Sequence, residues 1–279
     1  MTLGNDLKMN FMIKKSDMKD GYVAYVKQGN LEPAQLELWS YNASYYAASY
    51  SVAAKEMTDV LSCEIYDAEG YLVSNPFTRT VAQYAMTLLN NASQKATLKS
   101  VIVDMLNYGT EAQKYFKYNE DAYANAEVTE AQQAQFATGD VECSNVQDKI
   151  LNCAGSNLSL EDSILLNVFF SGVSGKDISK MSATIEYVDY KGNTVTATVG
   201  AEKYGSSMAK VVVNRIVLAD AKRPINVKLF DADGTKIGEG VESVESYIAR
   251  NLTNASTGAI NMAIIKFATS AYNYLGGTN

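Results

Sequence analysis

The chain has 279 residues, a length typical of about two domains, with 47% hydrophobic and 20% charged residues. Its 24 basic and 31 acidic side chains give a net charge of −7. No cluster of Lys and Arg could neutralise a phosphate backbone or an anionic bilayer, so we expect neither nucleic acid nor a membrane surface as partner. No apolar stretch is long enough for membrane insertion.

Histidine is absent, which removes the commonest general base and the commonest transition-metal ligand. A Ser or Cys nucleophile would have no histidine base, and no glycine-rich phosphate loop occurs. Among 31 acidic residues, no local pattern marks a glycosidase pair. We therefore predict a protein that is not an enzyme, with no catalytic residue, no cofactor and no metal site. A glycan-active enzyme is the competing class.

The N-terminal residues and the cysteines leave both secretion and disulfide bonding open. Met1–Asp6 lacks a basic region followed by an apolar run and is not a signal peptide, which leaves secretion open. Cys63, Cys143 and Cys153 are an odd number and give no disulfide framework. Cys143 and Cys153 are close in sequence and could form a disulfide bond. The alternative is that all three cysteines are reduced thiols.

An internal repeat is the strongest pattern in the chain. Residues 63–70 read CEIYDAEG, and residues 227–234 read VKLFDADG. Three further blocks match in the same order: 25–30 with 187–193, 81–84 with 244–247, and 108–112 with 267–271. We predict two homologous modules of about 120 residues each. Their predicted bounds are 1–125 and 157–279, with a linker at 126–156.

Each predicted module begins with strands. Apolar side chains alternate along Leu7–Ile13 and again along Ile164–Phe170, which is typical of a strand with one buried face. A second strand in each module carries Tyr25 or Tyr187 and runs towards a Gly-Asn turn. The β-branched run Val211–Val217 predicts another strand, whose first-module counterpart is richer in Tyr and Ala.

Helices are predicted after the strands. Val81, Tyr84, Ala85 and Leu88 follow helical spacing, and Thr80 with Gln83 has the spacing of a capping box. A second stripe runs from Leu98 to Tyr108, and its second-module counterpart runs from Ile260 to Tyr274. We predict an α+β fold in which each module is a small, mainly antiparallel β-layer packed with a helix pair.

An aromatic cluster is the candidate ligand-binding site. The stretch 36–51 contains one tryptophan and four tyrosines, whereas the aligned stretch 202–215 keeps essentially only Tyr204. A core that both modules share does not explain aromatic rings that only the first module has. Aromatic rings can anchor a protein interface or stack on sugars. Alternatively, the rings cover the other module or fill a wider core. The candidate residues are Trp39, Tyr41, Tyr45, Tyr46 and Tyr50.

Two acidic segments, 67–70 and 231–234, resemble part of a calcium loop. The second contains Asp-x-Asp-Gly, but the remaining ligands of an EF-hand are missing. Asp at the first position and Gly at the last also suit a β-turn. We interpret both segments as turns.

The segment 108–119, YGTEAQKYFKYN, resembles one that recurs in tandem modules of large secreted or cell-surface proteins of gut Firmicutes such as Ruminococcus, Blautia and related Clostridiales. The resemblance implies a secreted or surface-attached protein, part of a larger modular protein of a gut bacterium. Some such proteins engage polysaccharide, and others bind host proteins, including immunoglobulins. We expect a non-catalytic adhesin that binds a host protein through the aromatic-rich face of the first module, with carbohydrate binding to dietary or host glycans as the alternative.

Overall fold

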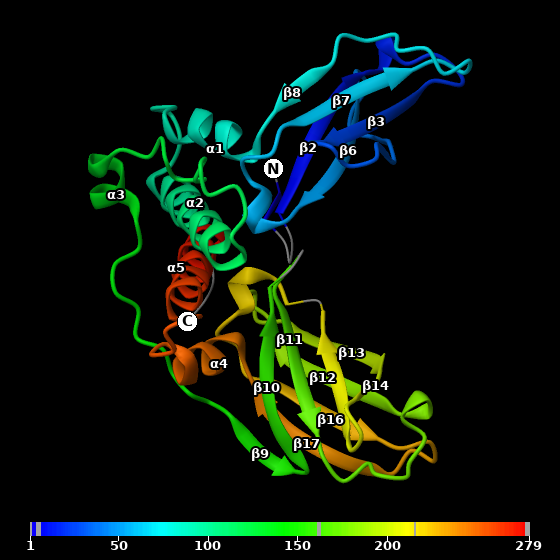
Figure 1. Cartoon of the computed structure of the whole chain (residues 1–279), viewed down its shortest axis with the longest axis vertical. Helices are drawn as coiled ribbons and strands as arrows, with labels where there is room; N and C mark the ends of the chain where they lie inside the picture. Colours follow the sequence, from blue (N-terminus) through cyan, green and yellow to red (C-terminus); the bar gives the residue numbers. More distant parts are fainter. Residues whose placement is uncertain (1, 4–6, 161–162, 215, 277–279) are drawn as a thin grey trace. The chain divides into compact units, whose positions relative to one another are not determined.

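The structure, a computed structural model, describes residues 2–3, 7–160, 163–214 and 216–276. These residues form five α-helices and four antiparallel β-sheets, which confirms the predicted α+β class. The chain divides into two compact units, Met1–Phe136 and Ala137–Asn279 (Figure 1). Among the described helices, none has the length and apolar character needed to cross a bilayer.

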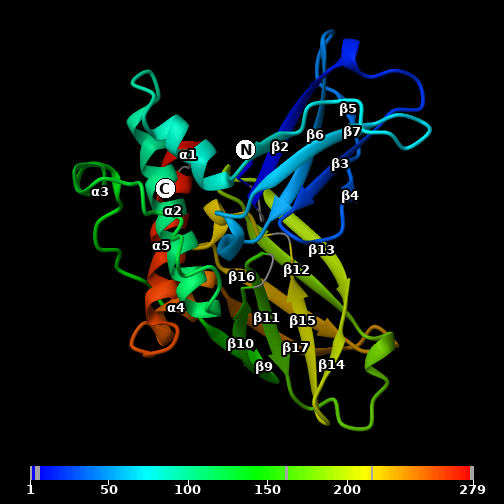
Figure 2. The same ribbon diagram turned by 45° about the horizontal axis from the view of Figure 1, so that its top comes forward.

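The first unit contains two four-stranded sheets instead of the single β-layer that we expected. One sheet has the order β1-β2-β6-β5, formed by Thr2–Leu3, Leu7–Lys14, Tyr45–Val52 and Trp39–Ser40. The other has the order β4-β3-β7-β8, formed by Ala34–Gln35, Val23–Gln28, Leu61–Tyr66 and Phe77–Arg79 (Figure 2). Alternate residues of β2, β3 and β7 are buried, so each sheet turns one apolar face into the core of the unit.

The second unit repeats this arrangement with one added strand. Its first sheet has the order β10-β11-β15-β14, formed by Cys153–Ser159, Leu165–Phe170, Met208–Val213 and Glu202–Tyr204. Its second has the order β13-β12-β16-β17-β9, formed by Thr194–Gly200, Ser182–Val188, Ile225–Phe230, Lys236–Glu242 and Asp148–Leu151. The shared strand order is what a tandem repeat requires. Common descent of the two halves stays a prediction.

The helices of each unit follow its last long strand. The first unit has α1 (Val81–Leu89), α2 (Ala96–Phe116) and α3 (Glu130–Phe136), and the second has α4 (Val244–Asn251) and α5 (Gly258–Leu275). The predicted capping box of α1 is confirmed, because Gln83 N donates to Thr80 Oγ1 at 3.0 Å and Thr80 N donates to Gln83 Oε1 at 3.1 Å. At the start of α4, Ser246 N donates to Ser243 Oγ at 2.9 Å.

The helix pair packs on the connection between the two sheets of its own unit. This connection contains a short 3₁₀ turn, Ala54–Glu56 in the first unit and Leu218–Asp220 in the second, against which α2 and α5 pack. Ala82 N donates to Met57 O at 2.9 Å, and Glu245 N donates to Ala221 O at the same distance. The same backbone contact therefore joins helix to sheet connection in both units.

Residues 126–136, which we expected to begin the linker, pack on the first unit. Thr129 caps α3, since Gln132 N donates to Thr129 Oγ1 at 3.2 Å. Asn107 on α2 exchanges two hydrogen bonds with Gln133, of 3.0 and 2.7 Å. At the other end of the expected linker, β9 and the start of β10 belong to the sheets of the second unit. Side-chain amides on α2 thus give order to a segment whose composition alone resembles a linker.

The segment 108–119 uses its small and polar residues to hold the chain that follows α2. A Cβ on Gly109 would lie 2.6 Å from Met57 Sδ and 2.9 Å from Ala124 Cβ. Gln113 is fully buried; its Oε1 accepts from Ala124 N at 2.8 Å, and its Nε2 donates to Ala122 O at 2.9 Å. Thr110 Oγ1 accepts from Asn125 N at 3.1 Å. Close packing at Gly109 and hydrogen bonds from Thr110 and Gln113 therefore account for these three residue types.

We predict that Gly109→Ala destabilises the protein by about 1–3 kcal/mol, because the overpacking exceeds the gain in helix propensity. Gly139→Ala is the matched control, since nothing lies within 4 Å of the added Cβ, and it should change stability by less than about 0.5 kcal/mol. Urea unfolding of both variants measures the difference. An equal or higher stability of Gly109→Ala would contradict this description of the helix.

Asp220 makes the stability of the second unit depend on pH. Burial raises its pKa to about 6, and the charge of Asp189 adds to this, while the Tyr190 N–H, 2.6 Å from Asp220 Oδ1, and Arg223 lower it. A raised pKa in the folded state means that the contribution to stability is complete below the ordinary value of 3.8 and is lost as the pH rises through 6.

Asp220→Asn should therefore gain stability relative to the natural protein between pH 4 and pH 8. The gain is at most about 3 kcal/mol, since one pKa unit corresponds to about 1.4 kcal/mol. Urea unfolding of both proteins at the two pH values measures it. A difference in stability that stays constant with pH would show that Asp220 has an ordinary pKa.

Candidate binding surface

The pairing of β2 with β6 decides which way each aromatic side chain points. Residues directly opposite in an antiparallel pair share one face of the sheet. Tyr46 lies opposite Ile13, and Tyr50 lies opposite Met9. Ile13 and Met9 are buried core residues. Two of the five predicted site residues, Tyr46 and Tyr50, therefore belong to the core-facing side of the sheet.

Contacts of these two tyrosines agree with this placement. Tyr50 Oη donates to Gln28 Oε1 at 3.0 Å, which joins the two sheets of the unit. Burial raises the pKa of Tyr50, and the nearby Glu56 carboxylate raises it further. The Lys15 ammonium lies over the Tyr46 ring, 5.0 Å from its centroid. Both rings are half-buried on this side of the sheet, Tyr50 bonded to the second sheet and Tyr46 beneath Lys15.

Trp39, Tyr41 and Tyr45 lie on the opposite, solvent-facing side. Trp39 pairs with Ala47, which also lies opposite Met12. Tyr41 N donates to Tyr45 O at 3.0 Å and so continues the strand pairing by one position. Trp39 and Tyr41 are 46% and 62% exposed, Met12 is 46% exposed, and Tyr45 is half-buried. We call this surface the aromatic patch, formed by Met12, Trp39, Tyr41 and Tyr45.

Met12 was not among the residues predicted from the sequence. Its outward position follows from the alternation along Leu7–Lys14, where the odd-numbered apolar residues are the buried ones. A methionine on the polar side of such a strand departs from the alternating pattern. This departure was the feature of the sequence that could have identified Met12 as a surface residue of interest. Met12 and Trp39 flank Ala47 in the strand register, and Ala47 is 2% exposed.

The corresponding surface of the second unit has different chemistry. There Glu202 pairs with Lys210, and Lys210 pairs with Phe169, in the same β14-β15-β11 order. Lys210 Nζ lies 2.6 Å from Glu202 Oε2, so an ion pair occupies the row in which the first unit has Trp39 and Ala47. Tyr204 is exposed, and its ring lies 4.5 Å from that of Phe169. The second unit thus has an ion pair and two aromatic rings, one of them exposed, on the surface where the first unit has the aromatic patch.

Polar groups beside the patch bond to one another. Asn42 Oδ1 accepts from Ser44 N and Tyr45 N, each at 2.9 Å, and holds the turn between β5 and β6. Ser49 Oγ donates to Asn10 Oδ1 at 2.7 Å across β6 and β2. Lys14 is the exposed cation closest to the patch in the strand register, since it pairs with Tyr45. The patch thus offers ring and methyl surface with few uncommitted polar groups.

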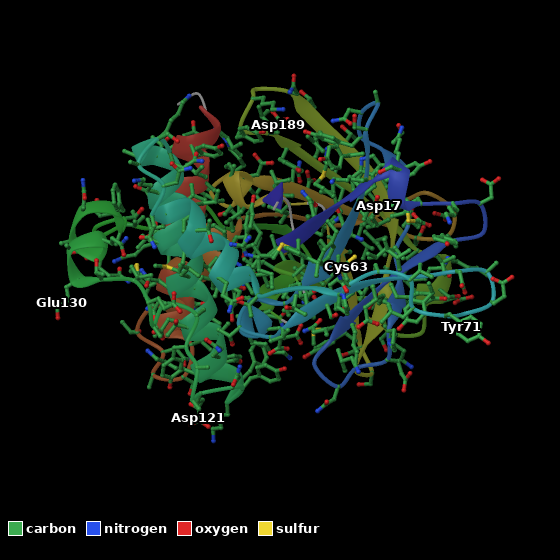
Figure 3. The ribbon with its side chains drawn as sticks, turned by 90° about the horizontal axis from the view of Figure 1, so that it is seen from above. Asp17, Cys63, Tyr71, Asp121, Glu130 and Asp189 are labelled. Atoms are coloured by element: carbon green, nitrogen blue, oxygen red, sulfur yellow. The ribbon has the colours of Figure 1, made fainter. Side chains whose placement is uncertain are left out.

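Both acidic segments form turns, as interpreted. Gly70 N donates to Asp67 O at 3.1 Å, and Gly234 N donates to Asp231 O at 3.0 Å. The two glycines have φ of +85° and +83°, values that favour glycine. Asp67 Oδ1 also accepts from Tyr71 N, in the loop labelled in Figure 3. Within the described parts of the chain, no group of three or more Cys, Asp or Glu side chains is arranged to hold a metal ion.

All three cysteines are free thiols, which decides against the Cys143–Cys153 bond that the sequence left open. Cys63 is buried in β7, and burial raises its pKa to about 11, with a further contribution from Glu64. Burial also raises the pKa of Cys143 and Cys153. A thiol with a raised pKa is a weak nucleophile, so none of the three is activated for covalent chemistry at neutral pH.

Comparisons with known proteins add little. No protein-family model and no curated protein matches the chain. Among solved structures it is similar to a pullulanase from Anoxybacillus sp. LM18-11 complexed with maltotriose, at 8% identity and a TM-score of 0.19. A pullulanase type I from Bacillus subtilis str. 168 complexed with maltose matches at 8% identity and a TM-score of 0.20. Each match covers 82% of this chain and 23% of the pullulanase, so the chain spans less than a quarter of those enzymes.

The two sides of the sheet should respond differently to truncation. We predict that Trp39→Ala changes the free energy of unfolding by less than about 1 kcal/mol, since the ring is half exposed. Tyr50→Ala should cost about 2 kcal/mol, because it removes packing on the core side of the sheet and the bond to Gln28. Chemical denaturation measures both values. A larger loss for Trp39→Ala than for Tyr50→Ala would mean that the faces are assigned in reverse.

Proposed function

We propose that the chain is a non-catalytic extracellular binding protein and that its aromatic patch binds a host protein, with immunoglobulins among the candidate partners. The observation that carries this proposal is the location of Trp39, Tyr41 and Tyr45 on one exposed side of a sheet. Exposed apolar side chains that gather on one surface mark interaction sites. The resemblance of segment 108–119 to modules of secreted gut-bacterial proteins supports the extracellular location.

A protein partner suits the patch better than a glycan. Tyrosine, tryptophan and methionine are enriched in protein interfaces. Binding of a sugar needs polar groups beside the rings to bond its hydroxyls. The side-chain oxygens of the nearest amides, Asn42 and Asn10, already accept hydrogen bonds from neighbouring groups of the protein. Glycan binding is the second candidate because Trp39 and Tyr41 present two rings on one side of a strand.

Trp39 is the sole tryptophan of the chain, so its fluorescence reports on the patch without a label. The experiment titrates the protein with immunoglobulins and other secreted host proteins, and in parallel with a panel of glycans. The proposal expects a shift in Trp39 emission with a host protein and none with glycans. A shift with glycans alone would identify the patch as a carbohydrate-binding surface.

Truncation of the patch should weaken binding without unfolding the protein. We predict that Trp39→Ala and Tyr41→Ala each reduce affinity for the partner about thirtyfold, the effect of losing an anchor worth about 2 kcal/mol. Tyr204→Ala in the second unit is the matched control, since it removes an exposed ring at the corresponding strand and should leave affinity unchanged. Surface plasmon resonance measures affinity for all three variants. Equal loss in all three would place the binding site elsewhere.

A further inference from the structure

Strand β13 forms one edge of the five-stranded sheet of the second unit (Figure 1). It pairs with β12 along its whole length, from Thr194 opposite Val188 to Gly200 opposite Ser182, without a bulge. The turn at 189–193 precedes it and β14 follows it, so this edge lies within the sequence, away from both termini. Among the described residues, no strand pairs with β13 on the side away from β12. The sheet therefore has an open edge seven residues long.

The hydrogen bonds at the two ends of this ladder show which backbone groups face the open edge. Asp189 N donates to Asn193 O at 2.9 Å, and Ala201 N donates to Met181 O at 3.2 Å. The odd-numbered residues of β13, in step with these two pairs, therefore bond to β12. Backbone groups of successive residues point to opposite sides of a strand, so those of the even-numbered residues point to the open edge. These residues are Thr194, Thr196, Thr198 and Gly200.

Strand β13 lacks the features with which proteins usually protect an edge strand, which are short length, charged side chains, proline and bulges. Its sequence, TVTATVG, contains no charged residue and no proline, and its threonines and valines favour strands. The strand at the corresponding position in the first unit, β4, has only two residues and follows Pro33. The opposite edge of the same sheet, β9, carries Asp148 and Lys149. Strand β13 is thus an edge that another strand can extend.

The sequence of β13 reads almost the same in both directions from Ala197. Thr196 and Thr198 flank Ala197, and Val195 and Val199 come next. When two identical antiparallel strands are related by a two-fold axis at Ala197, Thr196 of one copy lies opposite Thr198 of the other, and Val195 lies opposite Val199. The two strands then overlap along all seven residues, and each threonine or valine around the axis meets its own kind.

We propose that the edge of β13 binds β13 of a second copy of this chain, as an antiparallel pair with its two-fold axis at Ala197. In this register Thr196 and Thr198 exchange backbone hydrogen bonds, because both direct their N–H and C=O groups to the open edge. Threonine pairs form on the exposed face and valine pairs on the other face, and both kinds of cross-strand pair stabilise a sheet. An edge that pairs with itself is used up, so the assembly closes as a dimer.

A second copy suits this edge better than an unrelated polypeptide does. The backbone groups alone would accept any extended segment, whereas the symmetric order of the side chains matches β13 itself. Charge does not oppose the pairing either. Glu186 lies opposite Thr196 on β12, and its carboxylate lies 3.8 Å from Lys228 Nζ. In the joined sheet the two copies of Glu186 are three strand spacings apart, about 14 Å, which exceeds the screening length of about 10 Å at 0.1 M salt.

Dimer formation at β13 goes beyond the proposed function, because β13 belongs to the second unit and the aromatic patch belongs to the first. Analytical ultracentrifugation of the whole chain tests for the dimer. We expect a monomer–dimer equilibrium with a Kd below about 0.5 mM, since about eight backbone hydrogen bonds form between the strands. Trp39→Ala should leave this Kd unchanged. A chain that stays monomeric at that concentration would overturn the proposal, and so would a dimer that Trp39→Ala abolishes.

Two double variants at the same exposed positions test the two-fold axis at Ala197. Thr196→Lys with Thr198→Lys places like charges opposite each other in the dimer, whereas Thr196→Lys with Thr198→Glu places opposite charges there. We expect the first variant to dimerise at least about tenfold more weakly than the natural protein and the second to dimerise at least as tightly. The second variant controls for folding, since it also replaces both threonines with charged residues. Equal dimerisation of the two variants would overturn the proposal.

Amide hydrogen exchange locates the pairing at single residues of the natural protein. The N–H groups of Thr196 and Thr198 face the open edge, so we expect their exchange to slow at least about tenfold as the concentration rises and the dimer forms. The N–H groups of Val195 and Ala197 bond to β12 and should stay protected at every concentration. A dimer that leaves the exchange of Thr196 and Thr198 unchanged would overturn the proposal.

Discussion

The register between β2 and β6 is the constraint on which the rest of the first unit depends. Because Met9 lies opposite Tyr50 and Met12 lies opposite Ala47, the pairing sends one set of side chains into the core and the other set to solvent. A shift of one residue would expose the apolar set and bury Lys8 and Lys14. The apolar core therefore holds the register, and the register in turn places the aromatic patch.

Local periodicity was enough to predict much of this architecture. The alternation along Leu7–Ile13 and the helical stripe from Leu98 to Tyr108 correspond to β2 and to part of α2, and the capping box at Thr80 forms as expected. The division of the strands into two sheets could not be predicted in the same way. Whether β2 pairs with β3 or with β6 depends on contacts distant in the sequence, which one strand's pattern does not encode.

The aromatic cluster shows the same limit at the level of single residues. Composition identified the five rings of 36–51 as unusual, but composition does not distinguish the two faces of β6. Tyr45 and Tyr46 are neighbours in the sequence and lie on opposite sides of the sheet, since only one of them is opposite a core residue of β2. Met12 comes from another segment, so no search of that stretch could have found it.

The two units apply one strand order to different surfaces. On the second, an ion pair between Glu202 and Lys210 occupies the solvent side of the sheet and β10 completes its edge. On the first, Trp39 and Ala47 occupy the corresponding row. Exposed rings are costly for solubility, since they invite association. The second unit shows that this arrangement of strands folds with an ion pair in that row, so the fold does not require Trp39 there.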